Sequence, residues 1–318
     1  MSLMRCYNEA KRSRQEENSL ASERKVADGS WMDISLDEAV DAEKMSQQFG
    51  LPKDILAYAL DRDERARISY HPKEETYSII YNVVKQTKGR SHYETTPMMF
   101  VLQKNRLLTL THQENQYLVA AMDKLVQDNP TQTLPDLLLA SLFMITDYYF
   151  PKIEDMRRER NRINTQLREK TTKQKLFELS DLETGVVYFI DATKQNVIVL
   201  EQLRETEVFH TLHGHSRQQL KETLIEARQA AEMTQLDAQI LQQLSGTYNN
   251  ILNNNLNDTM RILTVLSILL TVPTIVTGFF GMNMPLPLGK RIFDWVLTIL
   301  ISAIGWFGLS AILKKILK

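Results

Sequence analysis

The chain has 318 residues and a formal net charge of −1, a length that allows one large domain or two. Its mean hydropathy is negative, so most of the chain is expected to be soluble. Cys6 is the only cysteine, which excludes intrachain disulfides and metal sites built from several cysteines. We therefore expect the soluble part to lie in the cytosol.

Residues 1–30 form a charged segment without an apolar core, so they do not resemble a signal peptide. Residues 31–205 follow as a predicted cytoplasmic α/β domain with charged helices. Alternating apolar residues predict strands at 31–35, 67–70, 76–84, 98–102 and 106–111. Helical spacing with start and stop signals predicts helices at about 35–49, 51–60 and 114–128, and another from Thr133 onward.

The stretch 151–175 is rich in both basic and acidic residues. A nucleic-acid patch is one interpretation. The interspersed acids and the lack of aromatic residues favour instead a solvated helical face with charge pairs four residues apart. No nucleic-acid partner is therefore expected. Residues 185–190 have strand propensity, but their surroundings are helical and we predict a helix there.

Three histidines, His210, His213 and His215, stand close together before the next helical stretch. They could bind zinc, but a zinc site needs further ligands and a fixed geometry. Gly214 lies among them, and Ser216 begins a capping-box pattern. We therefore predict a turn ahead of a long helix and leave open whether these histidines bind a metal.

No proline occurs between Ser216 and Pro273, which predicts one long helix that continues into a membrane. Two stretches without charge lie near the C-terminus, and each is close to the roughly 20 residues that cross a hydrocarbon core. The expected segments are a stalk helix at 206–261, a first membrane helix at 262–283, an external loop at 284–294, a second membrane helix at 295–313 and a basic tail at 314–318. Helices this long usually need partners in a coiled coil or an oligomer.

Basic residues set the expected orientation in the membrane. Arg261 precedes the first membrane helix, and three lysines follow the second within residues 314–318. The positive-inside rule places both flanks in the cytoplasm, although Lys290 and Arg291 in the loop weaken the bias. We expect a multi-pass protein of the cell membrane with both termini in the cytoplasm.

Small and polar residues recur on one face of the long helix. Alternate steps of three and four residues stay on one helical face. They reach a set that we call the polar stripe: Asn250, Asn253, Asn257, Met260, Thr264, Ser267, Thr271, Thr274 and Gly278. One interpretation is a helix–helix contact, because small and polar residues mediate packing in lipid. The other is a water-lined pore shared by several subunits, which suits an ion that keeps much of its water shell, as Mg²⁺ does.

The sequence Gly281-Met282-Asn283, preceded by Phe280, closes the first membrane helix. A short loop, a last membrane helix and a lysine-rich tail follow it. This arrangement resembles the CorA family of magnesium transporters. The resemblance implies an α+β cytoplasmic domain, a long stalk helix and two transmembrane helices, assembled as a funnel-shaped homopentamer with the stalk and first membrane helix around a central pore.

The resemblance also implies a selectivity filter made of Gly281, Met282 and Asn283. The Asn283 amide would hold a hydrated cation through its water shell. Phe280 departs from the family pattern, because the family usually has tyrosine before the tripeptide. The outer loop that follows also lacks the acidic residue that many members carry after a Met-Pro pair.

Further pore positions follow from the same resemblance. Met260, with Leu263 or Thr264 beside it, falls at the apolar constriction of the family. Asn257 and Thr274 fall at polar positions of the pore wall. Three of these residues besides Met260 belong to the polar stripe, which was found from spacing alone. The two lines of reasoning therefore agree on the pore-lining face.

The resemblance implies transport of a divalent cation, without enzymatic activity and without a bound cofactor. The expected partners are further copies of the chain, the lipid bilayer and the transported cation. Mg²⁺ is the leading candidate, and Zn²⁺, Co²⁺ and Ni²⁺ are alternatives on the same scaffold. A membrane-anchored cytosolic binding or enzymatic domain is a more distant alternative, against which the sequence shows no phosphate-binding glycine loop and no nucleophile or zinc-protease motif.

Overall fold

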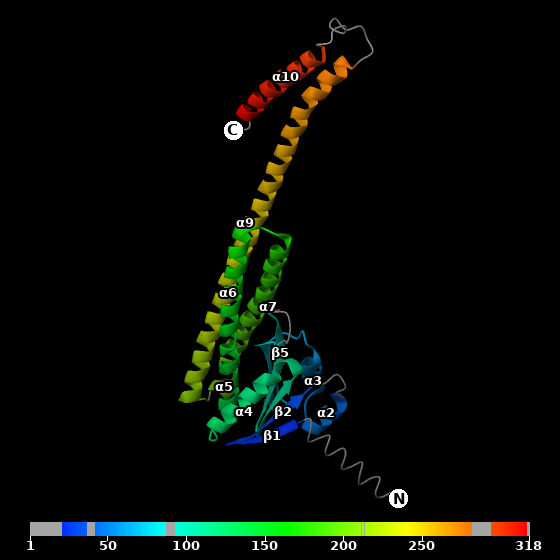
Figure 1. The fold of residues 1–318 in the computed structure, drawn as a ribbon. Coiled ribbons are helices and arrows are strands. Elements are labelled where there is room, and N and C mark those ends of the chain that lie inside the picture. Colours follow the sequence, from blue (N-terminus) through cyan, green and yellow to red (C-terminus); the bar gives the residue numbers. More distant parts are fainter. Residues whose placement is uncertain are drawn as a thin grey trace, which may run out of the picture. The chain divides into compact units, whose positions relative to one another are not determined.

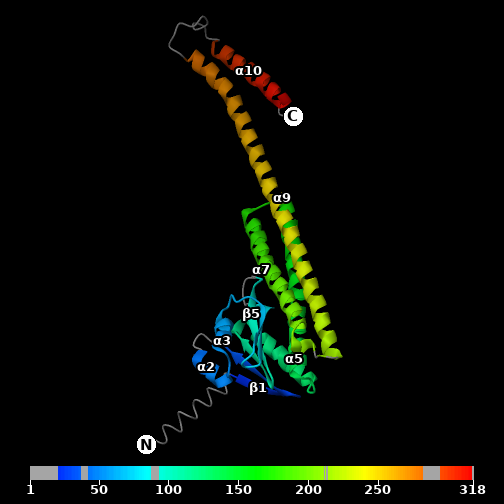
Figure 2. The same cartoon turned by 180° about the vertical axis from the view of Figure 1, so that it is seen from behind.

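The computed structural model describes residues 21–36, 42–86, 93–210, 212, 214–281 and 294–316. It divides into an N-terminal unit, Met1–Ser245, and a C-terminal unit, Gly246–Lys318. Figures 1 and 2 show the chain from opposite sides.

A six-stranded mixed sheet forms the centre of the N-terminal unit (Figure 1). The strands are β1 (Ala21–Val26), β2 (Gly29–Ser35), β3 (Arg67–His71), β4 (Thr76–Val84), β5 (Thr95–Gln103) and β6 (Arg106–Thr111). Their order is β1-β2-β6-β5-β4-β3, and all neighbours are antiparallel except β2 and β6, which are parallel. The five predicted strands are confirmed, with small shifts at their ends.

Strand β1 was not predicted. The charged segment predicted at 1–30 therefore includes residues that belong to the sheet. Glu23, Arg24 and Lys25 hide the strand in the sequence, because charged side chains are typical of sheet edges rather than sheet centres. β1 is an edge strand that pairs with β2 through a tight turn. A Cβ atom on Gly29 in this turn would lie 2.1 Å from the carbonyl oxygen of Asn105, so only glycine fits there.

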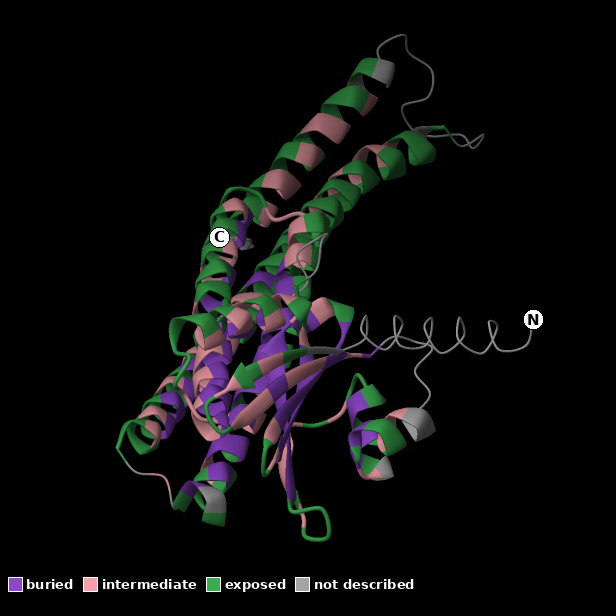
Figure 3. Cartoon of the chain, turned by 90° about the horizontal axis from the view of Figure 1, so that it is seen from below, coloured by how far each residue is buried: buried purple, intermediate pink, exposed green. Residues whose placement is uncertain are grey.

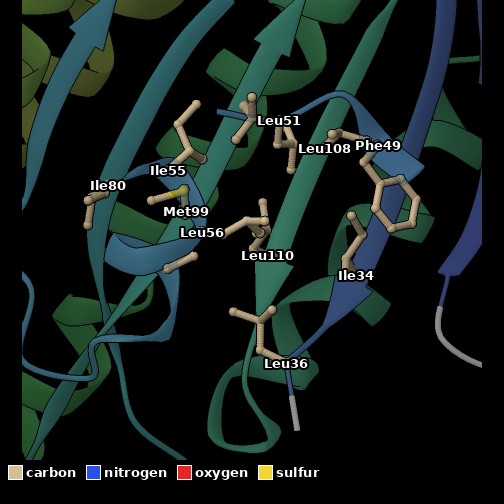
Figure 4. Packing of buried hydrophobic residues seen from close by; sticks show 12 residues of the cluster. Ile34, Leu36, Phe49, Leu51, Ile55, Leu56, Ile80, Met99, Leu108 and Leu110 are labelled. Carbon is tan, nitrogen blue, oxygen red and sulfur yellow. The ribbon is translucent and has the colours of Figure 1, made fainter. Parts of the chain in front are cut away.

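One face of the sheet packs against two short helices, α2 (Ala42–Phe49) and α3 (Lys53–Leu60). Figure 4 shows their buried side chains, with Ile55 beside Met99 and Leu56 beside Leu110. Burying one large aliphatic side chain contributes about 1.5–3 kcal/mol. This cluster therefore holds α2 and α3 on the sheet.

Longer helices cover the other face. After the single turn η1 (Gln113–Asn115) these are α4 (Gln116–Asp128), α5 (Leu134–Asp147), α6 (Tyr149–Glu169) and α7 (Lys173–Arg204). Both α5 and α7 pack on β4, where the hydroxyls of Tyr81 and Thr146 share a hydrogen bond of 2.8 Å. With both faces covered, β4 is buried at every position, and β5 and β6 beside it are mostly buried as well, whereas strands nearer the edges are less so. Figure 3 shows this as purple and pink strands within one sheet. The predicted helices are confirmed, and residues 185–190 lie inside α7 as expected.

An asparagine side chain completes the hydrogen bonding of β4. Strand β3 begins at Arg67, which pairs with Ile80, so the backbone of Asn82 has no strand partner on that side. Asn196 of α7 takes this place: its Oδ1 accepts from Asn82 N at 2.8 Å and its Nδ2 donates to Asn82 O at 2.8 Å. Tyr149 of α6 donates to the same oxygen at 2.9 Å. Both helices are thereby fixed to the sheet.

Helix α9 (His215–Phe280) follows the short helix α8 (Glu207–His210) and is a single helix of 66 residues, as predicted. It begins one residue before the expected cap, after Gly214 with φ +63°. Ser216 donates instead to the carboxylate of Asp136 in α5. Burial acts to raise the pKa of Asp136, but hydrogen bonds from Ser216 and Thr133 outweigh it and lower the pKa.

Within the N-terminal unit, α9 lies alongside α6 and α7 in both views (Figures 1 and 2). Arg157 and Arg160 of α6 donate to the carboxylate of Asp237 at 2.9 and 2.5 Å, and the Asp237 side chain is only 5% exposed. The sequence predicted a solvated charged face in this stretch. That holds for Arg158, which pairs with Glu154 four residues earlier and is 73% exposed, but Arg157 and Arg160 join two helices.

The C-terminal unit contains the rest of α9 and the helix α10 (Asp294–Ile316). Both helices are long and apolar enough to cross a membrane. They contain the two membrane stretches expected from the sequence.

We predict that Asp237→Ala destabilises the protein, because Arg157 and Arg160 then keep their charges without an acceptor. Removing one partner of a fully buried pair costs roughly 3–5 kcal/mol. Arg157 is 27% exposed, so we expect a smaller loss of about 2 kcal/mol. Thermal unfolding of the detergent-purified protein would show this as an apparent Tm lower by several degrees.

The matched control is Glu154→Ala, which removes an exposed pair with Arg158. Exposed pairs contribute about 0–1 kcal/mol, so its Tm should stay close to that of the unchanged protein. Equal Tm values for both variants would contradict a stabilising role of Asp237.

Candidate functional site

The polar stripe lies entirely within regular helix. All its positions from Asn250 to Gly278 are helical and exposed, and so is Leu263 beside it. The predicted pore-lining residues in this group are Asn253, Asn257, Met260, Leu263, Thr264, Ser267, Thr271, Thr274 and Gly278. Because the helix is unbroken, the steps of three and four residues place them on one face.

Helix α10 packs on the opposite face of α9. A Cβ atom on Gly305 of α10 would lie 2.9 Å from Val272, and a cavity of about 410 Å³ between the helices is lined by Pro273 and Thr277 of α9. Within the membrane stretch, the half-buried residues of α9 are Val265, Leu269, Val272, Pro273 and Val276. At 100° per residue this set is centred roughly opposite the polar stripe. The stripe is therefore no contact surface for α10.

The hydroxyl groups of the stripe donate to the helix's own backbone. Thr264 Oγ1 donates to Met260 O at 2.8 Å, and Ser267 Oγ to Leu263 O at 2.8 Å. Thr271 and Thr274 make the same bond to the residue four positions earlier, each at 2.9 Å. A hydroxyl has one hydrogen to donate and two lone pairs to accept with. With the hydrogen committed to the backbone, each oxygen offers its lone pairs to the outside.

This arrangement gives the stripe a defined chemistry. Water molecules around a cation point their oxygens inward and their hydrogens outward, so a hydrated cation needs acceptors in the wall. The hydroxyl oxygens supply acceptors in the membrane stretch, and the amide oxygens of Asn253 and Asn257 supply more at the start of the C-terminal unit. No stripe residue carries a charge. The face suits contact through water rather than direct coordination of a bare ion.

Pro273 interrupts the hydrogen bonding of α9 without ending the helix. It has no N–H to give to the carbonyl of Leu269. Thr277 lies one turn later, where its Oγ1 donates to Pro273 O at 2.8 Å and to Thr274 O at 3.2 Å. Neither oxygen is the one that loses its donor at Pro273. Thr277 was not among the residues predicted from the sequence.

Gly281 is the one member of the predicted filter among the described residues. Its N–H donates to Thr277 O at 2.9 Å at the end of α9. Met282 and Asn283 lie outside the described residues, as does most of the external loop. Their predicted roles stay predictions.

The histidine cluster is divided in the same way. His210 ends α8 and His215 begins α9, whereas His213 lies outside the described residues. In the part of the chain that the structure describes, no three His, Cys, Asp or Glu side chains are grouped to hold a metal ion. The predicted turn ahead of a long helix is confirmed at Gly214.

Comparisons with known proteins bear on the whole chain. The family model described as "CorA-like Mg2+ transporter protein" matches residues 27–315. The chain is 23% identical over 267 residues to the "Cobalt/magnesium transport protein CorA" of Methanocaldococcus jannaschii, with 82% of each chain covered.

Solved structures show a similar fold. The complete structure of the CorA magnesium transporter from Methanocaldococcus jannaschii matches with a TM-score of 0.74 and 21% identity, and covers 90% of both chains. The full-length CmaX protein matches with a TM-score of 0.70 and 14% identity over 90% of this chain and 88% of that chain. The α/β domain, long helix and final apolar helix thus occur together in other proteins.

We predict that the polar stripe meets water and the other exposed sides of α9 meet lipid. In a Cys6→Ser background, Thr271→Cys should react with a charged, water-soluble methanethiosulfonate reagent, since only a hydrated thiol ionises readily. Leu266→Cys is the matched control, because Leu266 is 52% exposed but far from the stripe around the helix. We expect Thr271→Cys to react at least about 10-fold faster in liposomes. Equal rates would contradict a water-lined stripe.

Proposed function

Because the chain belongs to the family of CorA-like Mg²⁺ transporter proteins, it is a divalent-cation transporter rather than an enzyme, and we propose that it conducts hydrated Mg²⁺ through a central pore. This proposal rests on the polar stripe of α9, an uncharged face whose oxygen atoms can accept hydrogen bonds from outside the helix. Mg²⁺ gives up its water reluctantly. A wall that accepts hydrogen bonds from bound water lets the ion pass without losing its shell.

The pore of this proposal requires several copies of the chain. A single helix face encloses nothing, and α10 occupies the opposite side of α9. Bringing the stripes of several copies together closes a pore and leaves the α10 helices outside. The proposed number of five copies comes from the family resemblance. The proposed orientation, with both termini in the cytoplasm, follows from Arg261 and the lysines of the tail.

The driving force in this proposal is the membrane potential. Moving one charge through 100 mV releases about 2.3 kcal/mol, so a divalent ion gains about 4.6 kcal/mol on entering. Asn283 with Gly281 and Met282 forms the outer filter. Met260, with Leu263 or Thr264, forms an apolar constriction that closes by excluding water.

Zn²⁺, Co²⁺ and Ni²⁺ are the alternative cargo. The curated relative from Methanocaldococcus jannaschii is named for both cobalt and magnesium transport. Transition metals bind best to imidazole and thiolate ligands. The polar stripe contains neither histidine nor cysteine, which favours Mg²⁺. The more distant alternative is a cytosolic domain for which the two helices serve only as an anchor. An anchor would have no need of the polar stripe.

We predict that Asn283→Ala lowers Mg²⁺ uptake at least about 10-fold, because a lost amide removes the acceptor at the filter. The assay is uptake into liposomes with an enclosed magnesium dye and an imposed potential. Asn255→Ala is the matched control, since Asn255 lies on the far side of α9 from the stripe. Flux of Zn²⁺, Co²⁺ or Ni²⁺ without flux of Mg²⁺ would keep the scaffold and change the cargo. If the assembled oligomer carried no divalent ion into the liposomes, the proposed pore would be contradicted.

We further predict that Met260→Ser raises uptake in the closed state several-fold, because a polar side chain lets water into the constriction. Ile262→Ser is the control: Ile262 is 69% exposed and lies across the helix from Met260. Closed conditions are found first, as those that minimise uptake by the unchanged protein. A Met260→Ser variant with unchanged uptake there would place the gate elsewhere.

A further inference from the structure

A cavity of about 640 Å³ in the N-terminal unit lies between the end of α7, helix α8 and the first turns of α9. This size is typical of pockets that hold small organic molecules, which run from about 300 to 1,000 Å³. Its lining has two chemically different parts. Buried apolar side chains come from Phe209, Leu220 and Leu224, and basic groups come from Arg204, His210, Arg217 and Lys221.

The charge of the lining is not balanced. Arg204 pairs with Glu205 at 2.9 Å, and both are at the cavity. Arg217 and Lys221 are exposed and form no ion pair with any residue that the structure describes. They stand four residues apart on α9, where two like charges face each other and destabilise a helix. An anion between them would remove that repulsion.

One class of ligand has chemical groups that suit both parts of the lining. A phosphate group accepts hydrogen bonds from arginine and lysine side chains and neutralises their charge. A lone phosphate would occupy only a small part of the cavity and would not reach across it to the side lined by apolar side chains. A nucleoside phosphate supplies both a flat, largely apolar ring system and a multiply charged group. We propose that this cavity binds a nucleotide, with the phosphates at Arg217 and Lys221 and the base against Phe209, Leu220 and Leu224.

The proposed site does not depend on the transport function. It joins the end of α7 to the first turns of α9, the helix that carries the polar stripe. Binding is measured without any ion flux, so a failure of the transport proposal and a failure of this one are distinguishable.

The test is isothermal titration of the full-length protein in detergent with ATP, inorganic phosphate and adenosine as separate probes. EDTA is present so that no divalent cation contributes. We expect ATP to bind most tightly, and raised salt to weaken its binding, because the contact is partly electrostatic. In Arg217→Gln/Lys221→Gln the Kd for ATP should rise at least 10-fold.

The matched control is Lys170→Gln/Lys173→Gln, which removes two exposed positive charges away from the cavity. Its Kd for ATP should stay within twofold of the unchanged protein. The proposal is overturned if ATP does not bind at millimolar concentration, or if both double variants lose the same affinity. Inorganic phosphate binding as tightly as ATP would overturn the assignment to a nucleotide.

Discussion

The structure of the C-terminal unit depends on one constraint: a backbone in hydrocarbon must satisfy its own hydrogen bonds. Helix α9 therefore stays continuous through Pro273, which removes only one backbone hydrogen bond. The same constraint directs Thr264, Ser267 and Thr271 to donate to their own helix. Each hydroxyl that donates to its own helix in this way still has lone pairs that can accept hydrogen bonds from outside the helix. The need for internal pairing thus produces the acceptor surface on which the proposed function rests.

The N-terminal unit holds the first part of α9 in place. Polar contacts reach it from three helices: Asp136 of α5 at Ser216, Arg157 and Arg160 of α6 at Asp237, and Glu201 of α7, which accepts from Arg228 at 2.5 Å. Through Asn196 and Tyr149, α7 and α6 are in turn bonded to β4. A chain of polar contacts therefore connects the sheet to the first part of α9.

Most of the fold could be predicted from local sequence patterns, whereas contacts between residues far apart in the sequence could not. Alternation gave five of six strands, and β1 escaped because Glu23, Arg24 and Lys25 conceal an edge strand. The stripe was predictable because a helix repeats at a known spacing. Asp237 was not, since its partners lie 77 and 80 residues away and nothing local marks a buried carboxylate. The packing of α10 on the side of α9 opposite the stripe likewise could be seen only in the structure.

Asn196 has a consequence for how the N-terminal unit behaves in a crowded cell. A sheet edge with free backbone groups is a template for another chain, which can add as a further strand and start aggregation. Strand β3 is short and begins only at the partner of Ile80, so the backbone of Asn82 would present such an edge. Asn196 occupies both groups of Asn82 with its own amide. A helix side chain thus protects this stretch of edge against strand addition, in a protein whose proposed assembly brings several copies of the same sheet close together.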